Sequence, residues 1–292
     1  MKKICVVGSI NMDLVVSADT YPRPGETILG HSFITNPGGK GANQAVAAAR
    51  LGAETVMLGC VGDDIYGAKL VENLDAEGVD TRHIRRVEGP SGIANILIAD
   101  HDNSIVVVPG ANYTVDRTYL DSMLDVIKES DMVLTQLEIP LDTVVYLSHI
   151  CKREGIPLLL NPAPAMPLPG ELIDNAVYIT PNESEVEIIF GEKVDIKQLI
   201  RQYPQKLIVT LGKEGAIYFD GAEIVHIPSI SVDVVDTTGA GDTFNGAFAV
   251  GMMAARDMAY AIALANTAAG LSVTKMGAQR GMPAWREVMD QL

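Results

Sequence analysis

The sequence predicts an α/β fold, a three-layer αβα sandwich with a mainly parallel central sheet and a small β-sheet lid. Short apolar runs alternate with helical patterns along the 292 residues. The runs are apolar enough to be buried on both faces, which is typical of parallel strands covered by helices on each side. Extended segments interrupt this alternation at about 11–36 and 91–109, and we expect them to form a lid over a site. We expect a single domain over residues 1–292.

Pattern and turn residues predict the elements of the first half in order. Apolar runs predict strands at Lys3–Val7 and Thr55–Cys60, and the periodic segments Ala42–Leu51 and Tyr66–Glu77 predict helices. The lid takes the extended segments Asn11–Val16, His31–Thr35 and Ile93–Val108. We expect the last of these to be a hairpin whose loop is residues 100–104.

The second half repeats the alternation. The predicted strands are Met132–Thr135, Pro157–Leu160, Val177–Thr180 and Leu207–Thr210, and the predicted helices are Leu141–Arg153 and Glu183–Phe190. Asp220-Gly221 predicts a tight hairpin between Ala216–Phe219 and Glu223–Ile227. The proline-rich stretch 161–170 predicts a rigid loop after a strand.

Charge and composition exclude several classes of protein. Because 22 Lys and Arg stand against 37 Asp and Glu, the formal charge is −15, and only 5% of residues are aromatic. A nucleic-acid binder needs a dense basic surface, so we expect none. No segment has the length of a membrane span and the start does not fit a signal peptide, so we expect a cytoplasmic protein. Cys5, Cys60 and Cys151 are too few and too scattered for a disulfide framework or a metal cluster, which predicts buried thiols.

The most informative segment runs from Asp236 to Gly246, reads Asp-Thr-Thr-Gly-Ala-Gly-Asp-Thr-Phe-Asn-Gly, and leads into an apolar helix. Its small residues allow the backbone to approach a ligand, and the helix start offers free N–H groups to an anion. A carboxylate beside that anion, Asp242, can take the proton of a hydroxyl that attacks phosphorus. The plainer alternative is a glycine-rich connection with Asp242 as a helix cap.

A second glycine-rich segment, 36–44, also leads into a helix. Lys40 supplies a positive charge, and the amide of Asn43 can donate to and accept from vicinal hydroxyls. Asn11 and Asp13 share one face of a predicted lid strand and suit a polyol, although a solvated strand face is the plainer reading. Segment 36–44 is not a Walker A loop, and Gly8-Ser-Ile-Asn is not a dinucleotide fingerprint.

Further polar residues follow the ends of predicted strands, where open α/β sheets bind ligands. Glu138 follows one strand, Asn182 and Glu185 open the helix after another, and Thr210–Gly215 follows a third. Each is weak alone, and helix capping is the alternative for Asn182 and Glu185. Their common place at strand ends favours a shared site.

Together these motifs resemble the PfkB carbohydrate kinase family, and within it the ribokinases. The segments 38–44, 161–165, 180–183, 210–212 and 236–246 occur in the order and approximate spacing of that family, over Gly8 to Trp285. The resemblance implies a ribokinase-like fold, with ATP-dependent transfer of the γ-phosphoryl group to the 5-hydroxyl of D-ribose. It also implies a homodimer formed through the lid.

The resemblance also implies roles for individual residues. Asp242 would be the base, and the N–H groups of Gly239, Ala240 and Gly241 would form the anion hole. The implied sugar contacts are Asn11, Asp13, Gly39, Lys40, Asn43, Glu138 and Asp242, with Ala94 and Ile96 as apolar lid contacts. The implied ATP contacts are Asn182, Thr210, Leu211, Gly212, Lys213, Glu214, Gly215, Gly241 and Asn266. Glu185 would organise Mg²⁺ through water.

A monovalent-cation site, expected to hold K⁺, is implied beside the anion hole. Its ligands would be Asp236, Thr238 and the carbonyl groups of Ser272, Lys275 and Gly277. The last ligand position, often a serine in the family, falls on Gly281, which has no hydroxyl.

Two alternatives remain. The first is a PfkB-family kinase that acts on 2-deoxyribose, a nucleoside or another furanose. Deoxyribokinases tend to have an apolar residue where this chain has Asn11, which favours ribose. The second is a non-catalytic sugar- or nucleotide-binding protein, which would have no use for a base at Asp242.

Overall fold

The computed structural model describes residues 2–100, 102–254 and 257–292. Its strands are β1 (Lys3–Val7), β2 (Asn11–Ser17), β3 (Ser32–Gly38), β4 (Glu54–Leu58), β5 (Cys60–Gly62), β6 (Arg85–Val87), β7 (Gly92–Ala99), β8 (Asp102–Val108), β9 (Met132–Thr135), β10 (Leu158–Leu160), β11 (Tyr178–Ile179), β12 (Val209–Thr210), β13 (Ala216–Phe219) and β14 (Ile224–Ile227). Its α-helices are α1 (Lys40–Arg50), α2 (Ile65–Ala76), α3 (Arg117–Ser122), α4 (Leu124–Lys128), α5 (Leu141–Glu154), α6 (Gly170–Asn175), α7 (Glu183–Phe190), α8 (Ile196–Gln202), α9 (Ala240–Met253), α10 (Met258–Ser272), α11 (Ala278–Gly281) and α12 (Trp285–Met289). Two 3₁₀ helices are η1 (Gly110–Thr114) and η2 (Gly212–Glu214).

The central sheet confirms the predicted α/β class. Five parallel strands lie in the order β11-β10-β9-β1-β4. Parallel bridges from Ile179 to Leu207 and from Asn182 to Thr210 continue it to β12, beyond which β13 and β14 run antiparallel. The sheet is therefore mainly parallel.

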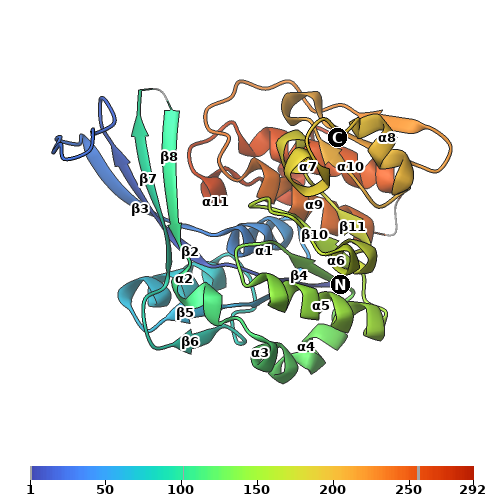
Figure 1. Ribbon diagram of the computed structural model, residues 1–292, viewed down its shortest axis with the longest axis horizontal. Helices are drawn as coiled ribbons and strands as arrows, with labels where there is room; N and C mark the ends of the chain where they lie inside the picture. The colour runs from blue at the N-terminus through green and yellow to red at the C-terminus, as the bar shows by residue number, and fades with distance from the viewer. Residues whose placement is uncertain (1, 101, 255–256) are drawn as a thin grey trace.

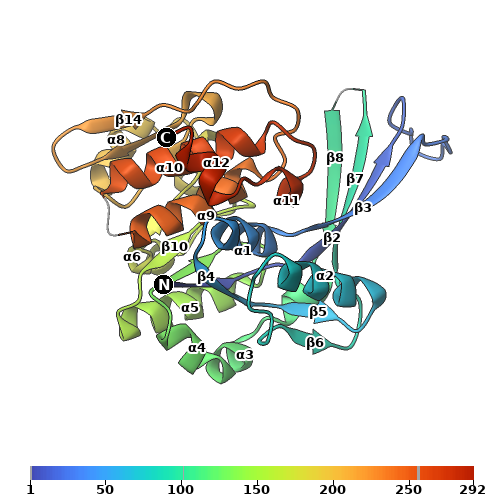
Figure 2. The same cartoon turned by 180° about the vertical axis from the view of Figure 1, so that it is seen from behind.

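Alternate residues of the central strands bury into two separate cores. In β1, Ile4 and Val6 pack into the core with α1, α2, α9 and α10, whereas Cys5 and Val7 pack into the core with α3, α5, α7 and α8. Figure 1 shows α5 in front of the sheet, and Figure 2 shows α1, α9 and α10 on the other side. Because both faces of the strands are covered, the three layers follow from the apolar runs.

A second sheet projects from this body. Its strand order is β3-β2-β7-β8, and we call these four strands the lid sheet. In Figure 1 it stands at the left, clear of the helices. Strand β2 pairs parallel with β7, whereas the two outer pairs are antiparallel.

Two local predictions were wrong. The expected strand Thr55–Cys60 divides into β4 and β5 at Gly59, and β5 pairs with β6 instead of continuing the central sheet. A side chain at Gly59 would lie 2.9 Å from the carbonyl oxygen of Gly8, so the chain turns where the backbones touch. The hairpin loop expected at 100–104 is shorter, since β8 already begins at Asp102; His101 of that loop lies outside the described residues.

The three cysteines are buried and free, as expected. Within the described ranges, no helix is long and apolar enough to cross a membrane.

Candidate active site

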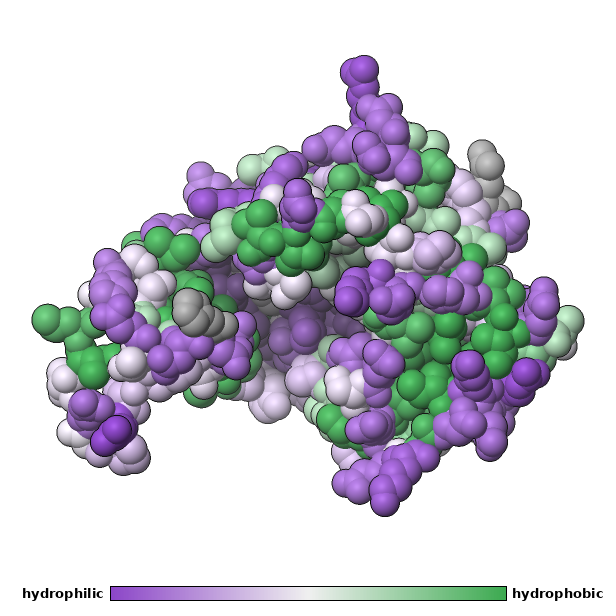
Figure 3. Space-filling model, turned by 90° about the horizontal axis from the view of Figure 1, so that it is seen from above, coloured by the Kyte–Doolittle hydropathy of each residue, from purple (hydrophilic) through white to green (hydrophobic). Residues whose placement is uncertain are grey.

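The candidate site lies at the carboxyl ends of the central strands. Ser9 follows β1, Glu138 follows β9, Asn161 follows β10 and Thr180 follows β11. Parallel strands bring these turns to one edge of the sheet, and the first turns of α1 and α9 come to the same edge. Figure 3 shows a hollow with mostly hydrophilic walls between the lid sheet, at the left, and the larger body.

A sharp turn at the start of helix α9 forms one wall of the site. Gly239 precedes its first residue with a left-handed φ of 78°, and a side chain there would lie 2.8 Å from Cβ of Ala278. In the part of the chain that the structure describes, the N–H groups of Gly239 and Gly241 have no acceptor. The N–H of Ala240 donates to the carbonyl oxygen of Thr237 at 3.2 Å. Free N–H groups at a helix start attract anions.

Asp242 lies in the first turn of α9 and is only 6% exposed. It is not the helix cap, because its carboxylate turns toward α1. Oδ2 accepts from Nδ2 of Asn43 at 2.9 Å, and Oδ1 accepts from Nε2 of Gln44 at 3.0 Å. Two amide groups therefore fix both oxygens of this buried carboxylate.

Opposing effects act on the charges of Asp242 and Lys40. Burial raises the pKa of Asp242, and the Lys40 charge together with the Asn43 and Gln44 hydrogen bonds acts against that increase. Burial also disfavours the charge of Lys40, yet the carboxylates of Asp242, Glu138 and Glu185 raise its pKa. A positive charge thus stands among the three carboxylates.

Amide side chains extend the contacts of Asp242 outward. Gln44 also donates to Oδ1 of Asn161 and accepts from Nε2 of Gln136. On the other side, Oδ1 of Asn43 accepts from Nε2 of Gln279 in α11 at 3.0 Å, and Gln279 in turn accepts from Asn73 in α2. A connected and largely buried set of hydrogen bonds therefore holds the Asp242 carboxylate.

Glu138 joins three segments of the site. Its Oε2 accepts from the hydroxyl of Ser9, from the backbone N–H of Lys40 and, at 3.4 Å, from Nδ2 of Asn11. The carboxylate therefore fixes the start of α1 beside the first residue of the lid sheet.

The lid sheet turns one polar face toward this carboxylate. The register pairs Asp13 with Ala94, and Asn11 lies two residues earlier on the same strand. Asn11, Asp13, Ala94 and Ile96 therefore share a face, whereas Asn95 points to the opposite one. Burial, together with the charges of Glu138 and Asp242, raises the pKa of Asp13 to about 7. A side chain at Gly38 would lie 2.4 Å from the Asp13 carboxylate, so glycine leaves room for it.

The residues expected at the nucleotide lie along the far end of the sheet. Asn182 bridges to Thr210, and the 3₁₀ turn η2 follows with Gly212, Lys213 and Glu214. Leu211 donates its N–H to the carbonyl oxygen of Gly215. Nδ2 of Asn266 donates to the carbonyl oxygen of Ile227 at 2.8 Å, so this amide holds the backbone next to Gly215.

Asn182 and Glu185 form the capping box that was the plainer alternative. Oδ1 of Asn182 accepts from the N–H of Glu185 at 2.9 Å, and the Glu185 carboxylate accepts from the N–H of Asn182 at 2.8 Å. Burial nevertheless raises the pKa of Glu185, and the charges of Lys40 and Asp242 also act on it. The cap therefore lies within electrostatic range of Asp242.

The six residues expected at a monovalent cation come together. Oδ1 of Asp236 accepts from the Thr238 hydroxyl, and Oδ2 accepts from the N–H of Gly277 at 2.8 Å. Although its burial acts in the opposite direction, these bonds lower the pKa of Asp236. The N–H of Gly281 donates to the carbonyl oxygen of Gly277.

Gly281 also lies against two further carbonyl groups of that set. A Cβ at Gly281 would lie 2.3 Å from the carbonyl oxygen of Ser272 and 3.6 Å from that of Lys275. The donor set is one of oxygens, which suits a hard cation. Among the described residues, no group of three or more His, Cys, Asp and Glu forms a metal cluster.

Several site residues were not predicted from the sequence, among them Ser9, Gln44, Asn112 and Gln279. Gln44 stands in the motif 38–44, so its position was an available signal, whereas Gln279 lies outside the motifs, between the expected cation ligands Gly277 and Gly281. Asn112 follows the last lid strand, far from any motif. Its role depends on a contact across 101 positions of the sequence with Asn11.

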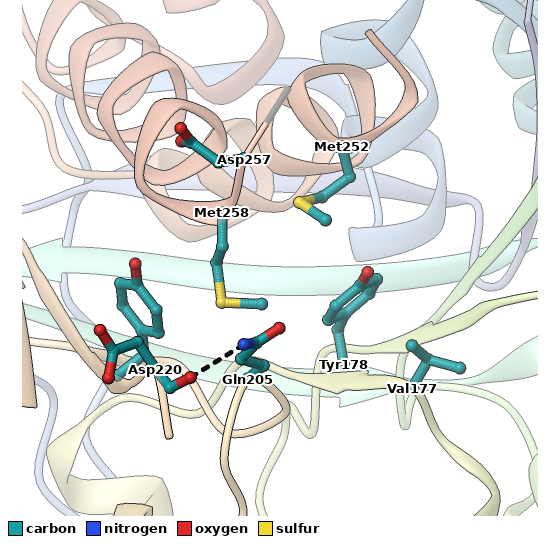
Figure 4. A pocket seen from close by; sticks show the side chains of 8 residues that line it. Val177, Tyr178, Gln205, Asp220, Met252, Asp257 and Met258 are labelled. Carbon is teal, nitrogen blue, oxygen red and sulfur yellow. Dashed lines mark hydrogen bonds between the residues drawn. The ribbon is translucent and has the colours of Figure 1, made fainter. Parts of the chain in front are cut away.

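A separate cavity of about 470 Å³ opens at the other edge of the sheet. It lies at the start of β11, beside Tyr178 and Gln205, and Figure 4 shows Met252 and Met258 pointing toward these two residues. Asp257 beside it is occupied as the cap of α10. The cavity has no part in the candidate active site.

Comparison with known proteins agrees with this geometry. The model of the pfkB family of carbohydrate kinases matches residues 1–285. The chain is 53% identical over 293 residues to ribokinase from Bacillus subtilis (strain 168), and the match covers 100% of both chains. It is 37% identical over 300 residues to a deoxyribokinase from Salmonella typhi, covering 99% of this chain and 98% of the other.

Solved structures give the same picture. Ribokinase from Arabidopsis thaliana, complexed with ribose and ATP, superimposes with a TM-score of 0.92 at 33% identity. The match covers 99% of this chain and 98% of that one.

Proposed function

Because the chain belongs to the pfkB family of carbohydrate kinases, we propose that it transfers the γ-phosphoryl group of ATP to the 5-hydroxyl of D-ribose. The products are ribose 5-phosphate and ADP. The observation that carries the proposal is the buried carboxylate of Asp242, fixed by Asn43 and Gln44 beside the free N–H groups at the start of α9.

The chemistry follows from that arrangement. The sugar hydroxyl loses its proton to the Asp242 carboxylate while its oxygen attacks the γ-phosphorus, and the bond from that phosphorus to the ADP oxygen breaks. The N–H groups of Gly239 and Gly241 receive the negative charge of the transferred group. Donors set in advance for such charge contribute on the order of 3 kcal/mol each. Lys40 lies among the same carboxylates and balances the charge.

The polar face of the lid sheet supports a sugar as the acceptor. Asn11, Asp13 and Glu138 offer amide and carboxylate groups to vicinal hydroxyls, and Ala94 and Ile96 offer apolar contact from the same face. ATP would lie along Thr210–Gly215, with Asn182 near its phosphates and Asn266 toward its base.

Two metal ions complete the proposal. A divalent ion, for which we propose Mg²⁺, would neutralise phosphate charge. The carboxylate of Glu185 would bind this ion through a water molecule. K⁺ would be held by Asp236, Thr238 and the carbonyl groups near Gly281, whose close approach supports an all-oxygen site. Gly281 has no hydroxyl to offer, and the carbonyl oxygens of Ser272 and Lys275 beside it would serve as ligands instead.

The main alternative is the same phosphoryl transfer to an acceptor other than ribose. A coupled assay of ADP release with ATP, Mg²⁺ and K⁺ compares ribose, 2-deoxyribose, fructose, fructose 6-phosphate and adenosine. We expect the largest kcat/KM with ribose. A larger value with another acceptor would keep the chemistry of Asp242 and overturn the sugar, and no turnover with any of the five would favour a non-catalytic binding protein.

We also propose a homodimer formed through the lid sheet. The sheet exposes Phe33, Val106 and Val108 on the face that points away from Asp13, and Val106 is 62% exposed. A second copy of the chain would cover this apolar face. Sedimentation of the wild type should give a dimer, and Val106→Lys should shift it toward the monomer; a monomeric wild type would contradict the proposal.

A further inference from the structure

Asn112 lies in η1, directly after the last lid strand, and is only 1% exposed. Its side chain is bound on two sides. Oδ1 accepts from the backbone N–H of Ile10 at 2.9 Å, and Nδ2 donates to Oδ1 of Asn11 at 2.6 Å. Nδ2 also lies 3.4 Å from the carbonyl oxygen of Ile10.

These contacts leave the two amides one orientation each. A backbone N–H can only donate, so it must face the oxygen of the Asn112 amide, and the NH₂ group then faces Asn11. The oxygen of Asn11 is therefore occupied. Its own NH₂ group is turned to the carboxylate of Glu138, which only accepts, at 3.4 Å.

With its oxygen bound to Asn112 and one N–H directed to Glu138, Asn11 has one N–H left to donate to a sugar. This N–H can donate a hydrogen bond to the oxygen of a sugar hydroxyl. The Asn11 side chain cannot accept a hydrogen bond from that hydroxyl. The neighbouring carboxylates of Asp13 and Glu138 accept hydrogen bonds in their ionised form. Because the direction of its amide is fixed, Asn11 is a donor beside these acceptors.

The backbone of the lid sheet presses on this pair. A Cβ at Gly92, the first residue of β7, would lie 2.2 Å from Oδ1 of Asn11 and 2.2 Å from Nδ2 of Asn112. The hydrogen bond between Asn112 and Asn11 thus lies where three segments meet: the start of β2, the start of β7 and the segment after β8. Only glycine at position 92 leaves room for this pair of amides, whose orientation is fixed by the N–H of Ile10.

We propose that Asn112 is a positioning residue for sugar specificity, because it fixes the amide of Asn11 with its donors toward the substrate. The inference rests on the proposed function. Asn112 touches no substrate and acts through Asn11. A sugar that lacks the hydroxyl read by Asn11 leaves a buried N–H without a partner, which is a strong ground for rejection.

The test compares kcat/KM for ribose with kcat/KM for 2-deoxyribose and 3-deoxyribose. Asn11→Ala first identifies the hydroxyl that Asn11 reads, as the analogue whose discrimination falls. Asn112→Asp keeps the shape and can accept from Ile10, but it cannot donate to Asn11, so the Asn11 amide loses its anchor. We expect Asn112→Asp and Asn112→Ala to lower the discrimination against that same analogue by about tenfold or more.

A matched control lies in the same 3₁₀ turn. Thr114 donates its hydroxyl to the carbonyl oxygen of Ala111 and does not contact Asn11, so Thr114→Val should leave the discrimination unchanged. In Asn11→Ala, adding Asn112→Ala should produce no further loss of discrimination.

The outcomes separate the inference from a structural role. If the Asn112 variants lose kcat/KM equally for all three sugars, the residue only supports the fold and the inference is wrong. It is also wrong if Asn11→Ala leaves every ratio unchanged. If the wild type does not phosphorylate ribose at all, the proposed function fails instead.

Discussion

Nε2 of Gln279 donates to Oδ1 of Asn43 at 3.0 Å, and this bond sets the direction in which Asn43 faces Asp242. Because the oxygen of the Asn43 amide is occupied by Gln279, its NH₂ group is left for the carboxylate. Gln279 belongs to α11, the same short helix whose backbone gathers the candidate cation ligands. Helix α11 therefore connects Asp242, through Gln279 and Asn43, to the candidate cation ligands.

Gln279→Leu should weaken both the fold and the reaction. The change removes the partner of the buried Oδ1 of Asn43 and of the half-buried Nδ2 of Asn73, which costs about 1–3 kcal/mol of unfolding free energy. Freed from Gln279, Asn43 can turn away from Asp242, so kcat should fall more than ribose affinity. Urea unfolding and steady-state kinetics measure the two effects. Arg280→Ala, its exposed neighbour, is the control, and a Gln279→Leu variant as stable and active as that control would contradict the account.

Ribose affinity should depend on pH through Asp13. The pKa of this carboxyl is raised to about 7, so its proton is retained as the pH falls below 7. A sugar hydroxyl donates to the ionised form, so binding must displace that proton. The dissociation constant should rise below pH 7, by no more than about tenfold per pH unit, and should level off above it.

Calorimetric titration of ribose between pH 5.5 and 8.5 measures that dependence. Asp13→Asn should bind more weakly at pH 8 and should lose this part of the pH dependence. A wild-type affinity that is constant across the range would show that Asp13 does not accept a sugar hydroxyl in its ionised form.

Discrimination between ribose and 2-deoxyribose should depend on Asn11. Asn11→Leu removes the N–H that would donate to the 2-hydroxyl of ribose. The ratio of kcat/KM for ribose to kcat/KM for 2-deoxyribose should therefore fall by about tenfold or more. Asn95→Leu makes the same change on the opposite face of the lid sheet and should leave the ratio unaltered. An unchanged ratio in Asn11→Leu would remove Asn11 as the discriminating residue.

The cation region makes two predictions from one site. Exchange of K⁺ for a bulky organic cation should lower kcat, because the clustered oxygens suit a small hard ion.

Gly281→Ser should destabilise the fold by about 1–3 kcal/mol, since its Cβ would lie against the carbonyl oxygen of Ser272. Activity assays in each salt and thermal unfolding of the variant test these two statements. Activity that is indifferent to the cation would show that no monovalent ion contributes.

The sequence predicted the fold well because its strands are apolar on both faces. Lys3–Val7 and Met132–Thr135 were predicted at the bounds found, since no residue in either run competes for another structure. The break at Gly59 was missed, because it depends on contact with Gly8, which no local pattern reveals.

The candidate site could be predicted as far as its motifs extend. Glycine-rich turns before helices marked Lys40 and Asp242, because that pattern has a chemical meaning by itself. Asn112 and Gln279 could not be found, since an amide acquires its role only from the partner that the fold brings to it. The capping box of Asn182 and Glu185 was recognisable from spacing, but the nearby charges of Lys40 and Asp242 were not.

The central claim is that the carboxylate of Asp242 removes the proton of the attacking hydroxyl. The most direct measurement compares ADP release with ribose in the wild type and in Asp242→Asn, with ribose affinity measured separately by calorimetry. The account predicts that kcat falls by about 10²–10⁴ while ribose binding is largely retained. A variant that turns over ribose at close to the wild-type rate would contradict it.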